Sequence, residues 1–158
     1  YLDTDQRQLI ASEPRGILIT QVQKALPSMG RTQELNFNHP IKFLAASNVA
    51  TDSVNTATNR VKLQINGTDV TDYKFIDPHY TTAASYYHAP NSKTDPQLYA
   101  FPFCLDTSRL QPTGSLNFSR LDSARIVSET SNFKDTIYAV NFNILRVENG
   151  MGGLLYSN

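Results

Sequence analysis

Three histidines and one cysteine are the residues of this chain whose side chains most readily do chemistry: His39, His79, His88 and Cys104. His79 and His88 lie nine residues apart, which is not the one-turn spacing that puts two metal ligands on one helix face. His39 and His79 each neighbour a proline at an expected turn. Exposed turn histidines are therefore the favoured interpretation, and a site assembled only in three dimensions stays open.

The thiol of Cys104 lies in the apolar run LYAFPFCLD, which is typical of a β-strand. A thiol buried in such a run is more often inert than catalytic. Because it is the only cysteine, no intramolecular disulfide and no cysteine-based zinc site can form. We expect no catalytic residue, no cofactor and no metal in this chain.

Other chemical motifs have ordinary structural explanations. The glycines of GMGGLL lack the Lys-Ser/Thr of a phosphate-binding loop, so residues 148–153 are predicted to form a turn. Asp69 and Asp72 lie close together, but a hairpin accounts for them without acid–base catalysis or calcium. Neither G-x-S-x-G nor H-E-x-x-H occurs.

Length and charge exclude several functional classes. With 158 residues, the chain is long enough for one domain with a hydrophobic core. Its 14 basic residues balance 14 acidic ones, and they form no basic run, so no field draws in nucleic acid or an anionic membrane. No stretch approaches the ~20 apolar residues that span a bilayer. The chain begins at Tyr1 without methionine, and we expect it to be part of a longer protein.

The stretch Gln111–Ile126, QPTGSLNFSRLDSARI, mixes polar and apolar residues in a way that predicts a structural corner. Apolar side chains there are expected to enter the core, while four polar ones fix the corner by binding neighbouring backbone: Asn117, Ser119, Arg120 and Asp122. Arg120 is expected to make buried hydrogen bonds. Two sequons make Asn66 and Asn117 candidate glycosylation sites, although backbone hydrogen bonding is favoured for Asn117.

Short stretches of β-branched and aromatic residues predict an all-β sandwich or barrel. Strands are expected over 17–24, 33–38, 41–46, 60–65, 68–74, 98–105, 124–129, 136–147 and 154–156. Two short helices are expected over 6–12 and 79–88, and loops over 48–59 and 89–96. The clearest signal is the alternation of 60–65 followed by Asn66-Gly67, which predicts a hairpin.

The predicted core follows from alternation along these strands. Over 136–147, Tyr138, Val140, Phe142 and Ile144 are predicted to share one face, with Asn141 and Asn143 on the other. The expected core residues are Val61, Leu63, Ile65, Phe101, Phe103, Val140 and Phe142.

Taken together, these segments resemble a known family. The resemblance rests on YLDTDQRQ, GILITQVQ, ELNFNHPIKFL, KLQINGTD, LYAFPFCLD, QPTGSLNFSRLDSARI and YAVNFNILRVENGMGGLLYSN, in this order from Tyr1 to Asn158. The chain is similar to the major capsid proteins of nucleocytoplasmic large DNA viruses, such as iridoviruses, phycodnaviruses and mimivirus-like relatives.

The resemblance implies an eight-stranded antiparallel jelly-roll sandwich with one or two short helices in its loops. It further implies that residues 1–158 are a single jelly roll, the second of two in a longer protein. Homotrimers of that protein would form pseudo-hexagonal capsomers that tile an icosahedral shell. The expected partners are the same protein, neighbouring capsomers and minor capsid proteins, without direct nucleic-acid binding or membrane insertion. The expected location is the virion, with assembly in the host cytoplasm.

Two other functions stay open on the residues alone. A lectin-like or receptor-binding jelly-roll module predicts an exposed aromatic side chain beside carboxylates. A cupin-like metal enzyme predicts histidines that converge in space.

Overall fold

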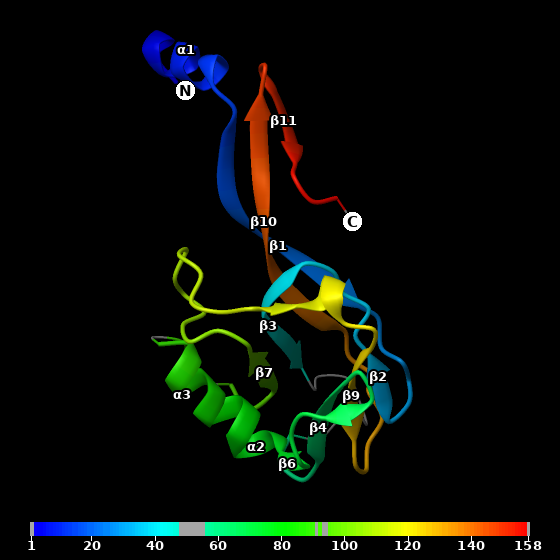
Figure 1. The fold of residues 1–158 in the computed structure, drawn as a ribbon. Helices are drawn as coiled ribbons and strands as arrows, with labels where there is room; N and C mark the ends of the chain where they lie inside the picture. Colours follow the sequence, from blue (N-terminus) through cyan, green and yellow to red (C-terminus); the bar gives the residue numbers. More distant parts are fainter. Residues whose placement is uncertain (1, 48–55, 91, 93–94, 158) are drawn as a thin grey trace.

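The computed structural model describes residues 2–47, 56–90, 92 and 95–157, which form a sandwich of two antiparallel sheets (Figure 1). Sheet A has the order β1-β10-β3-β7, with bounds Arg15–Ala25, Ile137–Glu148, Pro40–Ser47 and Leu98–Pro102. Sheet B has the order β2-β9-β4-β5, with bounds Thr32–Glu34, Ala124–Ser128, Arg60–Ile65 and Thr68–Asp69. Shorter strands are β11 (Met151–Leu154) on β10, β8 (Leu116–Asn117) on β3 and β6 (Lys74–Phe75) on β4. The chain crosses between sheets as in a jelly roll, and the predicted fold class is confirmed.

The core lies between the two sheets. Ile41 and Leu44 enter it from β3, while Val61 and Ile126 enter it from β4 and β9, and all four are fully buried. Burying a large aliphatic side chain contributes about 1.5–3 kcal/mol, so this contact holds the sandwich together. Leu63 and Phe101 are buried in the core as predicted, and Ile65 and Phe103 are partly buried and pack against it.

The predicted hairpin after β4 is confirmed at its turn. Asn66 and Gly67 both have positive φ, 50° and 78°, as a tight two-residue turn requires. The return strand is shorter than the predicted 68–74, because pairing stops after Asp69 and resumes only at Lys74. In between, the Val70 N–H still donates to Leu63 O at 2.9 Å.

The prediction for the faces of β10 was wrong. Ile137, Ala139 and Asn141 are buried on the side that faces sheet B, whereas Tyr138 is 48% exposed on the other side. Val140 is only half-buried, and Phe142 is buried outside the main core, with the Lys42 ammonium 5.5 Å from its ring centroid. The register of β10 against β3 shifts between Val140 and Asn141, which marks a β-bulge.

Several strand ends also differ from the predictions. Burial alternates through Leu35 and Phe37 as expected, but the regular strand β2 ends at Glu34. Strand β7 ends at Pro102, on the edge of sheet A, where a missing backbone N–H is tolerated; Leu105 beyond it is 73% exposed.

The C-terminal turn is tighter than predicted. It consists of Asn149 and Gly150, both with positive φ. Strand β11 therefore already includes Gly152 and Gly153, and ends at Leu154 where a strand over 154–156 had been predicted.

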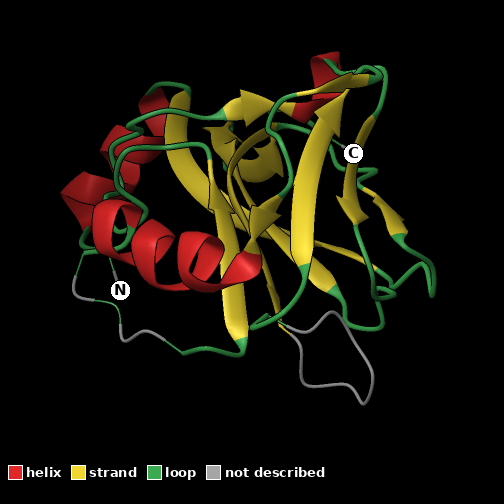
Figure 2. Ribbon diagram, turned by 90° about the horizontal axis from the view of Figure 1, so that it is seen from below, coloured by secondary structure: helices red, strands yellow, loops and turns green. Residues whose placement is uncertain are grey.

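The helical segments lie outside the layers of strands (Figure 2). Helix α1 spans Thr4–Ser12, and its N-cap Asp3 accepts a hydrogen bond from the Gln6 N–H at 2.8 Å. The predicted helix over 79–88 begins earlier, as α2 (Ile76–Pro78), and continues through a π-helical turn (His79–Ala83) into α3 (Ala84–His88).

No helix within the described residues is long and apolar enough to cross a bilayer. Most of the loop predicted over 48–59, and part of that over 89–96, fall outside the described residues.

Strands β1 and β10 extend beyond the sandwich as an arm, with β11 beside them and α1 at the tip (Figure 1). Among the described residues, β3 pairs with β10 over 137–141, and residues 143–148 pair with β1 and β11. We define the arm as residues 3–19 and 143–155.

Candidate functional site

The predicted corner is built around a single 3₁₀ turn, Phe118–Arg120. The Asn117 side chain accepts a hydrogen bond from the Ser119 N–H at 3.1 Å and so caps this turn. The Ser119 hydroxyl accepts from the His39 N–H at 2.8 Å, and the Phe118 N–H donates to His39 O at 3.1 Å. These bonds join the corner to the chain entering β3, while Phe118, 3% exposed, enters the core.

Asn66 supplies the second attachment of the corner. Its side-chain oxygen accepts hydrogen bonds from the N–H groups of Asp122 (2.9 Å) and Ser123 (3.1 Å). Its own N–H donates to Ser123 O at 2.8 Å. The tip of the β4–β5 hairpin is thereby fixed to the chain entering β9.

Two of the four predicted corner residues do not act through their side chains as expected. Arg120 and Asp122 are both exposed, and Asp122 takes part through its backbone N–H. The expectation of buried hydrogen bonds from Arg120 was wrong. Sequence reasoning missed Asn66 and His39, because they lie 56 and 80 residues away from their corner partners and no local pattern links them.

Replacing Asn66 with alanine is expected to lower the free energy of unfolding by about 1–3 kcal/mol. Two backbone N–H groups lose their acceptor, and alanine must take the left-handed conformation that Asn66 tolerates. Urea unfolding measures the change. Asp122→Ala is the control, because it removes only an exposed carboxylate, and equal stability of both variants would contradict this role of Asn66.

The three histidines do not converge. His39 is buried at 7% exposure beneath the corner, so its prediction as an exposed turn residue was wrong. His79, which is exposed as predicted, and His88, which is half-buried, line one pocket. Partial desolvation against the pocket wall, aided by the charge of Lys74, lowers the pKa of His79. His88 Nδ1 lies 2.8 Å from Cys104 O. Within the described part of the chain, no three His, Cys, Asp or Glu side chains are placed to hold a metal ion.

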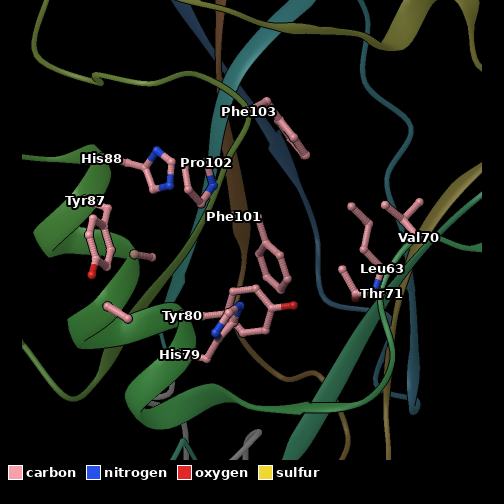
Figure 3. Close-up of a pocket in the computed structure, with 12 residues that line it drawn as sticks. Leu63, Val70, Thr71, His79, Tyr80, Tyr87, His88, Phe101, Pro102 and Phe103 are labelled. Atoms are coloured by element: carbon pink, nitrogen blue, oxygen red, sulfur yellow. The ribbon is translucent and has the colours of Figure 1, made fainter.

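This pocket lies between the helical segment 76–88, strand β7 and the β4–β5 hairpin (Figure 3). Its volume is about 460 Å³, and its walls are mostly apolar, with Leu63, Val70 and Phe101 opposite the helix. Tyr80 and Phe101 pack with ring centroids 4.2 Å apart. Besides its two histidines, the lining includes the hydroxyl groups of Thr71, Tyr80 and Tyr87, and no carboxylate or thiol.

Cys104 is buried, at 4% exposure, and burial raises the pKa of its thiol. A raised pKa means less thiolate at neutral pH, and the thiolate is the reactive species. We therefore expect a disulfide or maleimide reagent to label Cys104 slowly in the folded protein and quickly in denaturant. Rapid labelling of the folded protein would contradict this assignment.

Comparison with known proteins gives one consistent result. Residues 6–153 match the family described as large eukaryotic DNA virus major capsid protein. The major capsid protein of Pyramimonas orientalis virus is 32% identical over 186 aligned residues, which cover all of this chain and 47% of that protein. That of Paramecium bursaria Chlorella virus 1 is 28% identical over 230 aligned residues, covering 100% and 52%. The chain thus spans about half the length of these relatives.

Comparison of the fold with solved structures also finds virus capsid proteins. The capsid of Paramecium bursaria Chlorella virus 1 superimposes with a TM-score of 0.79 at 25% identity, over all of this chain and 55% of that one. The Faustovirus major capsid protein shares the fold at a TM-score of 0.60 and 12% identity, over 93% of this chain and 36% of that one. The chain therefore belongs to the major capsid protein family of large eukaryotic DNA viruses.

Proposed function

We propose that this chain is a structural unit of a viral shell, the C-terminal jelly roll of a double jelly-roll major capsid protein. The observation that carries the proposal is the family match over residues 6–153, supported by the structural likeness to a virus capsid over the whole chain. Relatives about twice as long leave room for a second jelly roll of similar size. The proposal assigns no catalytic residue, cofactor or metal to the chain.

The proposed working form is a homotrimer whose six jelly rolls make a pseudo-hexagonal capsomer. Neighbouring capsomers and minor capsid proteins are its proposed partners in an icosahedral shell. The proposed site of assembly is the host cytoplasm, and the final location is the virion. These assignments rest on the family resemblance.

The corner serves in this proposal as a rigid joint. Asn117 and Ser119 hold it to β3 and Asn66 holds it to β9, while Arg120 and Asp122 are exposed on its surface. Rigid joints suit a subunit that must repeat one shape across a shell. Asn66, which is exposed, and Asn117, which is half-buried, are the proposed glycan acceptors, and intact mass of the virion protein tests for added sugar.

The test is mass photometry of the full-length protein at increasing concentration. The proposal predicts trimers and larger assemblies. A protein that stays strictly monomeric at high concentration would count against it.

One observation favours a second function, that of a lectin-like or receptor-binding module. Tyr86 and Tyr87 on α3 are 77% and 72% exposed, and their ring centroids lie 5.1 Å apart. Exposed aromatic rings of this kind stack on sugars or partner proteins. Saturable binding on a glycan array that is lost in Tyr87→Ala would support this second function.

A further inference from the structure

Two Asn-Gly pairs occur in this chain, and each forms the turn of a β-hairpin. Asn66-Gly67 joins β4 to β5, and Asn149-Gly150 joins β10 to β11 at the outer end of the arm (Figure 1). The backbone of the two turns is nearly the same, with φ of 50° and 52° at the asparagines and 78° and 77° at the glycines. Both asparagines are exposed. The two turns are therefore a matched pair.

What differs between the turns is the attachment of the asparagine side chain. The side-chain oxygen of Asn66 accepts hydrogen bonds from the N–H groups of Asp122 at 2.9 Å and Ser123 at 3.1 Å. Among the described residues, nothing binds the side chain of Asn149, and the ion pair beside it, between Arg146 and Glu148, does not include it. One asparagine side chain is thus pinned, and the other is free to rotate.

An asparagine followed by glycine holds an electrophile and a nucleophile next to each other. The side-chain carbonyl carbon is the electrophile, and the backbone nitrogen of the glycine is the nucleophile, so their reaction is intramolecular and needs no encounter. Glycine has no Cβ to obstruct the approach. Open space surrounds the Cα of both Gly67 and Gly150, so steric access does not distinguish the two turns.

The reaction at the β10–β11 turn balances with water as its one co-reactant. The backbone nitrogen of Gly150 forms a bond to Asn149 Cγ, and the bond from Cγ to Nδ2 breaks. Ammonia leaves with the proton of the Gly150 N–H, and a succinimide ring remains. Water then opens the ring at one of its two carbonyl carbons. One opening gives aspartate, and the other gives isoaspartate, in which the main chain runs through the side-chain carbons.

Hydrogen bonding decides which of the two turns reacts. The side-chain carbonyl must turn toward the glycine nitrogen before the ring can close. At Asn66 this rotation breaks two hydrogen bonds and leaves the N–H groups of Asp122 and Ser123 without their acceptor. No such cost opposes the rotation of Asn149. We propose that Asn149 is a site of spontaneous deamidation through a succinimide, and that its attachment to the corner protects Asn66 from the same reaction.

Deamidation of Asn149 changes the end of the arm in two ways. It adds a negative charge beside Glu148, whose carboxylate pairs with Arg146 at 2.9 Å. Isoaspartate also lengthens the main chain of the turn by one carbon, between the paired residues Glu148 and Met151. A two-residue hairpin turn has a fixed geometry, so the extra carbon weakens the pairing of β11 with β10. This modification depends only on the turn and on water, and so goes beyond the proposed capsid function.

The experiment follows both turns in the same sample of full-length protein. The protein is incubated for days at mildly alkaline pH, either folded or unfolded in guanidinium chloride, and its peptides are mapped by mass spectrometry. Electron-transfer fragmentation distinguishes isoaspartate from aspartate. The matched control variant is Asn149→Gln, whose side chain is one methylene longer and closes a ring far more slowly.

In the folded protein we expect Asn149 to deamidate at least about tenfold faster than Asn66, because two hydrogen bonds must first break at Asn66. In guanidinium chloride the two sites should react at similar rates, because the hydrogen bonds to Asn66 are lost with the fold. The Asn149→Gln variant should form no isoaspartate at this turn.

Three results overturn the proposal. One is an equal or faster reaction at Asn66 in the folded protein. Another is a folded protein whose Asn149 stays intact while the unfolded sample reacts. The third is a difference between the two sites that persists in guanidinium chloride, because sequence neighbours and not the hydrogen bonds would then set the rates.

Discussion

Replacing Phe118 with alanine is expected to lower the free energy of unfolding by about 3–5 kcal/mol, the largest effect at the corner. Phe118 is 3% exposed, and its ring lies edge-on to Phe37 and tilted against Phe103, with both centroid distances 6.0 Å. Truncation removes these contacts and leaves a cavity that the short, pinned turn cannot close. Urea unfolding followed by circular dichroism measures the loss.

The control lies two residues away on the same turn. Arg120 is exposed, so Arg120→Ala is expected to change stability by no more than about 0.5 kcal/mol. A loss at Arg120 equal to that at Phe118 would show that the corner is held by the guanidinium and not by the buried ring.

Asn59→Ala is the second large expected effect, a loss of about 2–4 kcal/mol. Asn59 is fully buried, and its amide nitrogen donates to Ser128 Oγ at 2.7 Å. Its side-chain oxygen accepts from the Thr130 hydroxyl at 2.8 Å and from the Thr130 N–H at 3.2 Å. The substitution removes all three hydrogen bonds at the end of β9. The Ser128 hydroxyl, in a residue only 2% exposed, loses its donor where water has little access, whereas Thr130 is exposed and can bind water.

Thermal and urea unfolding of Asn59→Ala should be compared with those of Asn36→Ala, which alters an exposed asparagine. We expect the Asn36 variant to unfold like the original protein. If Asn59→Ala does the same, the buried network at the end of β9 does not stabilise the sandwich.

Local patterns were enough to predict much of the framework. The alternation through Val61, Leu63 and Ile65 and the Asn66-Gly67 turn depend on neighbours in sequence, and both are confirmed. The helix expected over 6–12 is confirmed as well, although it begins two residues earlier, at Thr4. The family resemblance then supplied the jelly-roll architecture, which no local pattern contains.

The predictions that were wrong concern polar residues that are buried and hydrogen-bonded to partners far away in the sequence. Asn141 was placed on the outer face of β10 because it is polar, yet it is fully buried and accepts a hydrogen bond from Gln23 at 3.0 Å. Asn143, 3% exposed, donates to Gln21 Oε1 at 2.8 Å. Both partners lie on β1, more than a hundred residues earlier in sequence. A prediction from alternation alone therefore turns the wrong face of such a strand toward the core.

The prediction for the corner was partly wrong for a related reason. Sequence reasoning gave all four polar residues a side-chain role. Asn117 and Ser119 have one, but the attachment to β9 depends on Asn66 and on the backbone N–H groups of Asp122 and Ser123. Asn66 had been noted only for its turn and its sequon. Its role as acceptor becomes visible once the hairpin lies against residues 121–123.

Electron cryo-microscopy of the assembled full-length protein tests the capsid assignment most directly. We expect trimeric capsomers with a pseudo-hexagonal outline, in which this jelly roll fits the density once per polypeptide, beside a second jelly roll of the same polypeptide. Particles in which this jelly roll is absent from a continuous shell, or in which it has no second jelly roll beside it, would contradict the capsid assignment.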